Sequence, residues 1–219
     1  MSEKPIIFSG EMVRAILEGR KTQTRRVIKP QPRIEIEYGD FGSVLSESWT
    51  WDHAGFNRQE ERTPGQTDPT QFCPYGKPGD RLWVRETFSY VTLAENEFDA
   101  NYSLHKRTPE GYPVSMFYKA AYGDESFPAN WIPSIHMPRW ASRITLEVVD
   151  VRVERVKDIS YDDIVAEGWD VKTSQPFTDG TAGQDARTWF RNLWDSINAK
   201  RGYGWDVNPW VWVIEFKRQ

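Results

Sequence analysis

A stretch of alternating apolar residues from position 144 to position 153 constrains the fold more than any other feature. Its apolar side chains occupy every second position, first in one phase and then in the other: Ile144, Leu146 and Val148, followed by Val149, Val151 and Val153. A period of two predicts a strand with one buried face. The one-residue slip at Val148–Val149 predicts a β-bulge, which bends a strand and is common in barrels.

Other segments predict a mixture of strands and helices around this strand. We expect strands at residues 5–8, 22–28, 81–88, 114–119 and 210–217. We expect helices at residues 10–18, between Ser160 and Gly168, and at residues 184–200. Ser9 and Ser160 are the expected N-caps, and Asp163 completes a capping box with Ser160. The order of these strands and helices along the chain favours the α+β class, and within it a small mixed β-barrel with attached helices.

The helix at residues 184–200 carries aromatic residues at helical spacing. Trp189, Phe190, Leu193 and Trp194 fall on one face. This spacing predicts that both tryptophans belong to the core and do not contact a ligand.

Two stretches without clear periodicity interrupt the pattern, at about residues 33–79 and 92–140. Both are rich in turn-forming residues, and we interpret them as long loop insertions into a single domain covering residues 1–219. The first and last strands are short and apolar and cannot be buried alone, so they should lie in one barrel-like sheet.

Composition and the N-terminus restrict the class of protein. The sequence contains no run of 18 apolar residues that would predict a membrane span. It also shows no basic segment followed by an apolar one that would predict a secretory signal. We therefore expect a cytoplasmic protein. The net charge of −4 excludes a wholly basic nucleic-acid coat but allows a local basic patch. Cys73 is the single cysteine, and the three histidines are scattered, so we expect no metal and no cofactor.

The densest polar signal is the basic stretch at residues 19–26. In a strand, Thr22, Thr24 and Arg26 share one face, and Lys21 can lean over that face from the preceding turn. Two hydroxyls, an ammonium and a guanidinium suit a phosphate, a carboxylate or a polar base edge. The alternative interpretation is a solvated basic hairpin edge without function.

Two further groups are weaker candidates for ligand contacts. Arg139 and Arg143 flank Trp140, and this cation–aromatic–cation pattern suits a platform on which a base stacks. A tryptophan packed under the aliphatic parts of two arginines explains the pattern equally well. Glu86 follows the strand at residues 81–88 and could enter the same cleft, but it could also be a surface ion-pair partner.

At these residues the sequence resembles the ASCH domain family, a PUA-like barrel group. The matching pieces occur in the family's order at residues 19–26, 78–84, 144–159, 166–168 and 213–217, about a third of the chain. Residues 137–143 and 208–210 resemble the larger ASCH proteins of phages and prophages. The resemblance implies a PUA-like fold and a cleft for RNA, single-stranded nucleic acid or a nucleotide.

One branch of this family hydrolyses the acetyl amide of N4-acetylcytidine with a Lys, a Thr and a Glu. By motif, Lys21 and Thr24 match the first two, and Glu167 matches the acid, with Asp170 as the alternative. This chain differs from that branch by its two insertions, which could reshape the pocket. Amide hydrolysis also needs a proton acceptor, so Lys21 requires a lowered pKa, which burial or the nearby Arg25 and Arg26 would produce.

These observations lead to three hypotheses. The first is a hydrolase acting on an amide of a modified pyrimidine nucleoside or a similar small substrate. The second is a non-catalytic module that binds RNA or single-stranded nucleic acid, and the third, from the phage-type resemblance alone, is a role in phage assembly. Residues proposed to contact the substrate or nucleic acid are Thr22, Arg25, Arg26, Glu86, Arg139, Trp140 and Arg143.

Overall fold

A five-stranded sheet forms the centre of the molecule. The computed structural model describes residues 2–38, 44–50, 69–122, 130–171 and 182–219. The strand order in the central sheet is β1-β5-β9-β10-β2. The strands are β1 (Glu3–Ile7), β5 (Arg81–Arg85), β9 (Thr145–Arg155), β10 (Trp210–Arg218) and β2 (Gln23–Val27). Only the pair β1 and β5 is parallel among these neighbours; the other pairs are antiparallel.

The predicted bulge lies where the sequence pattern changes phase. Glu215 of β10 pairs with Asp150 and Phe216 pairs with Val148, so Val149 is the extra residue on β9. Val148 is 1% exposed and Val149 is 49% exposed. The bulge therefore directs the Val149 side chain toward solvent. Both halves of β9 can then keep their other apolar residues on buried faces.

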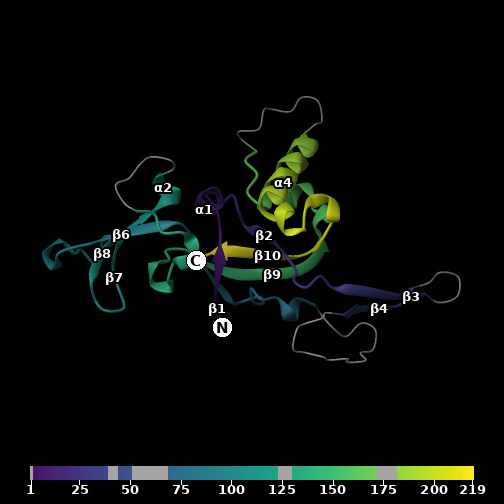
Figure 1. Ribbon diagram of the computed structural model, residues 1–219, viewed down its shortest axis with the longest axis horizontal. Helices are drawn as coiled ribbons and strands as arrows, with labels where there is room; N and C mark the ends of the chain where they lie inside the picture. Colours follow the sequence, from purple (N-terminus) through teal and green to yellow (C-terminus); the bar gives the residue numbers. More distant parts are fainter. Residues whose placement is uncertain (1, 39–43, 51–68, 123–129, 172–181) are drawn as a thin grey trace.

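Strand β10 is buried on both faces because a separate core packs on each side of it. Trp212 and Ile214 belong to the core that also contains α1 (Gly10–Leu17). Val211 and Val213 belong to the core formed with α3 (Tyr161–Ala166) and α4 (Ala182–Asn198). In Figure 1, α4 lies over one side of the central strands. The two-sided burial explains why the C-terminal strand is apolar at consecutive positions.

The helix starts follow the predicted caps. The Ser9 side chain accepts a hydrogen bond from the backbone N–H of Met12, and Ser160 and Asp163 form the capping box of α3. The expected α+β class is confirmed, and the first and last strands share the central sheet. Among the described residues this sheet is open, since no hydrogen-bonded ladder joins its edge strands β1 and β2.

Both segments that we interpreted as irregular insertions contain strands. In the first, β3 (Arg33–Tyr38) and β4 (Val44–Thr50) form a two-stranded sheet. In the second, β6 (Phe88–Thr92), β8 (Pro113–Tyr118) and β7 (His105–Arg107) form a three-stranded sheet, and α2 (Lys119–Tyr122) follows. These sheets extend from opposite ends of the central sheet (Figure 1). Some turn-forming residues of the first stretch, such as Gly39 and Pro64, lie outside the described residues.

In the second stretch, β8 matches the strand predicted at residues 114–119, whereas β7 was missed, and β6 begins at the end of the strand predicted at residues 81–88. Phe88, Met116 and Tyr118 are each at most 2% exposed and pack in a core of their own that also includes Trp83 of β5. A three-residue strand such as β7 is too short to show alternation, so turn-forming residues dominated the pattern.

A glycine at the end of α3 should be essential for stability. Gly168 has φ of +106°, and an added Cβ would lie 3.3 Å from the Ala15 Cβ and 3.4 Å from the Lys21 Cβ. Gly111 has φ of +93° with nothing within 4 Å of the added Cβ. Both Gly→Ala changes introduce backbone strain of about 1–2 kcal/mol, but only Gly168→Ala also crowds its neighbours. Urea denaturation should therefore show a larger loss of unfolding free energy for Gly168→Ala; equal losses would contradict the packing argument.

Candidate functional site

The basic stretch lies beside the end of α3 because backbone hydrogen bonds hold both segments together. Gly19 turns the chain after α1 with φ of +75°. Lys21 then forms an isolated antiparallel bridge with Glu167, and the Thr22 N–H donates to the Ala166 carbonyl at 2.9 Å. The motif and the acid that follows α3 therefore lie next to each other, although 146 positions separate Lys21 from Glu167.

Lys21 and Glu167 form a buried ion pair. The Lys21 Nζ lies 2.6 Å from Glu167 Oε2, and the two side chains are 0% and 4% exposed. The same Nζ also donates to the backbone carbonyl of Glu167 at 2.9 Å. Both charges are thus removed from water, so each depends on the other for its stability.

Burial lowers the pKa of Lys21 below its ordinary value. The ion pair and hydrogen bond with Glu167 oppose this effect, while the positive charges of Arg26 and Arg25 add to it. The net effect is a lowered pKa, so this amine gives up its proton more readily than a lysine in water does. A lysine with a lowered pKa in contact with a carboxylate is suited to proton transfer.

Arg25 connects this pair to two further acids. Its Nη2 lies 3.0 Å from Glu154 Oε2 and 3.1 Å from Asp163 Oδ2, and its Nη1 lies 3.5 Å from Glu167 Oε1. Burial opposes ionisation of Asp163, but hydrogen bonds from Ser160 and the charge of Arg25 outweigh it and lower the pKa of Asp163 to about 2. The capping box of α3 thereby also holds Arg25 against Glu167.

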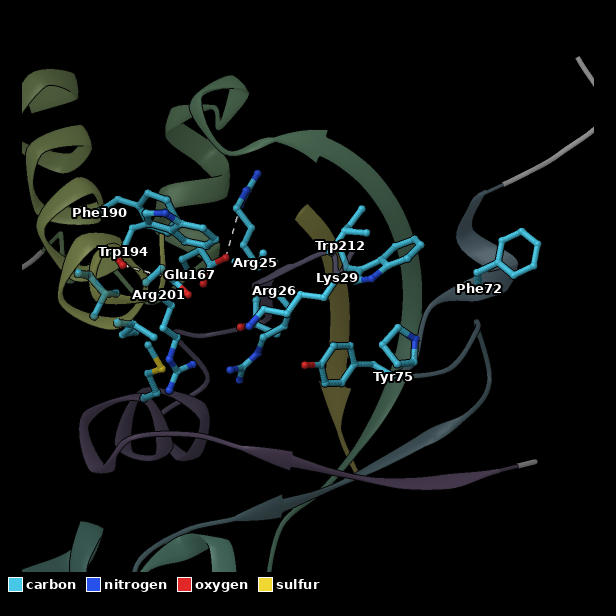
Figure 2. Close-up of a pocket in the computed structure, with 18 residues that line it drawn as sticks. Arg25, Arg26, Lys29, Phe72, Tyr75, Glu167, Phe190, Trp194, Arg201 and Trp212 are labelled. Carbon is cyan, nitrogen blue, oxygen red and sulfur yellow. Dashed lines mark hydrogen bonds and ion pairs between the residues drawn. The ribbon is translucent and has the colours of Figure 1, made fainter. Parts of the chain in front are cut away.

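A cavity of about 400 Å³ lies beside this network. In Figure 2, Phe190 and Trp194 of α4 lie on one side and Trp212 and Tyr75 on the other, with Arg26 between them. The volume is within the range of small-molecule sites. Its lining residues in the described part of the chain are Met12, Thr24, Arg25, Arg26, Val27, Ile28, Lys29, Phe72, Pro74, Tyr75, Glu167, Phe190, Leu193, Trp194, Ile197, Asn198, Arg201 and Trp212.

Several residues predicted from the sequence meet at this cavity. Thr24, Arg25, Arg26 and Glu167 line it, whereas Lys21 is buried behind Glu167 and does not. Glu167, rather than Asp170, is the acid that contacts the Lys21 amine and the cavity.

Thr22 is placed apart from the other motif residues. Its side chain is exposed and does not line the cavity, although Thr24 and Arg26 of the same expected face do. Thr22 instead contributes its backbone, which accepts a hydrogen bond from the Phe216 N–H and donates one to Ala166.

The remaining candidates lie outside the cavity. Arg143 forms an ion pair with Glu86, at 2.8 Å from its Nε, and its guanidinium lies 4.1 Å from the centre of the Tyr118 ring. Arg139 pairs with Glu3 at 2.7 Å. Trp140 packs against the core of the three-stranded sheet. Because both arginines are paired with acids, the structure does not present a free cation–aromatic–cation platform.

Some of the cavity wall could not be found by our interpretation of the sequence. Trp194 is buried in the core, as the helical spacing predicts, but it also lines the cavity, so the expectation that it makes no ligand contact does not follow from its burial. Trp212, Tyr75, Lys29 and Arg201 were not selected as candidates. The consecutive apolar residues from Trp210 were a signal for Trp212, and Lys29 belongs to a basic run from Arg20 to Arg33 that contains no acid. Nothing local marks Tyr75 or Arg201.

The described residues offer neither a metal-binding cluster nor a membrane-spanning helix. They contain no group of three or more His, Cys, Asp or Glu side chains that could hold a metal. Cys73 is buried, and burial raises the pKa of its thiol. No helix in the described ranges combines the length and apolar character needed to cross a membrane.

Comparisons of this chain with protein-family models, curated proteins and solved structures gave no match.

The lowered pKa of Lys21 predicts a pH dependence of stability. Between its lowered pKa and the ordinary value of 10.5, the unfolded chain binds more protons at this position than the folded chain does. The contribution of Lys21 to the unfolding free energy should therefore rise with pH toward the ordinary value. Chemical denaturation from about pH 8 to about pH 10 should show wild type gaining stability relative to Lys21→Met.

An exposed lysine supplies the matched control for this measurement. Lys200 is exposed to solvent, and the difference between wild type and Lys200→Met should stay flat over the same pH range. A flat or falling difference for Lys21→Met would mean that the fold holds this lysine as a cation.

Proposed function

We propose that this protein is an ASCH-type hydrolase that cleaves an amide on a modified pyrimidine nucleoside, with N4-acetylcytidine as the reference substrate. The observation that carries the proposal is the buried contact between Lys21 and Glu167 at the wall of a cavity that Thr24 also lines. These are the three residues that match the Lys, Thr and Glu of the family branch by motif. The PUA-like barrel belongs to the same proposal, supported by the bulged β9 within a mixed sheet.

The positions of the three side chains suggest a division of roles. Glu167 faces the cavity, so its carboxylate is the group that exchanges a proton with the substrate. Lys21 lies behind it with a lowered pKa and can take up or return that proton. The Thr24 hydroxyl attacks the acetyl carbon or orients a water that does so.

Hydrolysis then proceeds with a balanced exchange of groups. The oxygen nucleophile adds to the carbonyl carbon, the bond from this carbon to N4 breaks, and N4 leaves with a proton returned by the Glu167–Lys21 pair. Water supplies the hydroxyl of the acetate product, and cytidine regains its amine. Arg26 lines the same cavity and can stabilise the oxyanion of the tetrahedral intermediate.

Aromatic residues on opposite sides of the cavity suit a flat base. Trp212 and Trp194 are 3% and 4% exposed, so their positions are fixed by core packing. Rigid walls of this kind orient a heterocycle with little loss of side-chain entropy. This feature favours a single base over an extended strand, because a long single strand needs an open groove.

Nucleic-acid binding without chemistry stays the second candidate. It is favoured by the cationic side chains of Arg26, Lys29 and Arg201 at the cavity. A site with so few cations would engage two to four phosphates, giving a salt slope of about −1.5 to −3 on single strands. The assembly role implied by the phage-type resemblance stays an untested prediction.

Turnover of N4-acetylcytidine to cytidine and acetate tests the proposal. Lys21→Ala, Thr24→Val and Glu167→Gln should each lower kcat/KM by about 100-fold or more, because each removes a group used in proton transfer or attack. Chromatographic separation of cytidine from its acetylated form gives the rates, and circular dichroism checks that each variant is folded.

Thr92→Val is the matched control, since Thr92 is exposed on β6 and lies outside the cavity. It should keep wild-type turnover. Absence of turnover by the wild-type protein across a panel of acylated pyrimidine nucleosides, or full activity of Thr24→Val, would reject the proposed chemistry.

A further inference from the structure

The cavity carries more positive charge than its proposed chemistry needs. Its described lining contains the cations Arg25, Arg26, Lys29 and Arg201 and a single acid, Glu167. Lys21 donates a hydrogen bond to Oε2 of that acid, and Arg25 lies 3.5 Å from Oε1, which accepts no hydrogen bond from the described residues. Among the described residues no ion pair joins Glu167 to Arg26, Lys29 or Arg201, although the charge of Glu167 raises the pKa of Arg26 against the lowering effect of burial.

These three cations also find no acidic partner elsewhere in the described part of the chain. Arg26 donates to the Ile7 carbonyl at 2.7 Å and lies over the Phe8 ring, and its buried Nε has no hydrogen-bond partner among the described residues. The Lys29 Nζ lies 5.0 Å from the centre of the Tyr203 ring, a contact that leaves its three N–H donors available. A buried guanidinium nitrogen without an acceptor is costly unless a ligand supplies one.

Arg201 approaches the same cavity from another element. It ends the 3₁₀ helix η7 (Ala199–Arg201) that follows α4, whereas Lys29 follows β2. Lys200 precedes Arg201 and is also exposed, but it does not line the cavity. Cations from two separate elements thus line the same cavity. On a diffusely basic surface, the cations would not need to meet at one place.

We infer that the ligand carries a phosphate that Lys29 and Arg201 bind, and that the substrate is a nucleoside 5′-monophosphate rather than the free nucleoside. This inference rests on the proposed function for the base and the amide but adds a second recognition element. The aromatic walls take the base, and the cations take the dianionic phosphate. Arginine suits this role because its planar fork can bind two phosphate oxygens together.

The first experiment compares cytidine with cytidine 5′-monophosphate as binding probes by calorimetry. Wild type should bind the monophosphate about tenfold or more tightly, since hydrogen bonds to charged groups contribute strongly to affinity. Lys29→Gln and Arg201→Gln should each remove most of this preference. Lys200→Gln, the neighbouring exposed lysine, should keep it. Equal affinity of wild type for both probes would overturn the inference.

The second experiment measures kcat/KM for N4-acetylcytidine and for its 5′-monophosphate. The inference predicts a preference for the monophosphate that appears in KM and that Lys29→Gln and Arg201→Gln reduce. Equal kcat/KM values would overturn the inference and leave the proposed hydrolase intact. No turnover of either compound would reject the hydrolase, and the binding experiment would still decide whether the phosphate is recognised.

A third probe separates a free nucleotide from nucleic acid. A short single-stranded RNA without a terminal phosphate should compete poorly with cytidine 5′-monophosphate at the same salt concentration. If the RNA competes equally well, internal phosphodiesters occupy the site, and the assignment to a mononucleotide is wrong.

Discussion

The burial of Lys21 against Glu167 is the constraint on which the site depends. Two charges that are removed from water are tolerated only when they are paired and hydrogen-bonded, and here the lysine also contacts the Glu167 backbone. This requirement fixes the end of α3 against the turn that follows α1. Gly168 permits the approach, because a side chain there would meet Lys21 and Ala15. The chemistry proposed for the cavity therefore uses a contact that also fixes the packing of two helices.

The central sheet supports this pair because β10 is covered on both faces. One face packs on α1 and the other on α3 and α4, so residues on either side of the sheet have little freedom to move. Trp212 and Trp194 belong to the two different cores, and both line the cavity. The cavity thus lies where the two layers meet, and core packing fixes part of its wall. Phe72, Pro74 and Tyr75, from the segment before β5, and the exposed Lys29 and Arg201 complete it.

Much of the central fold was predictable from the sequence, since it depends on local patterns. The phase slip at Val148–Val149 located the bulge, and Ser9 and Ser160 located two helix starts. Lys21, Thr24 and Glu167 were selected from the family motif. The missed parts depend on long-range packing: β7 is too short for a periodic signal, the pairing of the predicted strand β8 with β6 and β7 is not marked locally, and Lys29, Tyr75 and Arg201 reach the cavity only through tertiary structure. The sequence left the role of Arg139 and Arg143 open for the same reason, because Glu3 and Glu86, the acids that pair with them, are distant in sequence.

The distribution of charge explains how a protein with a net charge of −4 can contain a cationic cavity. Two of its acids neutralise arginines beside the cavity: Glu154 and Asp163 hold Arg25, and both also contact Arg152. These acids lie outside the cavity lining, so they position Arg25 without reducing the positive potential inside. Net charge governs long-range attraction, which salt screens within about 10 Å, whereas a partly enclosed cavity responds to its own lining. An acidic chain and an anionic small ligand are therefore compatible.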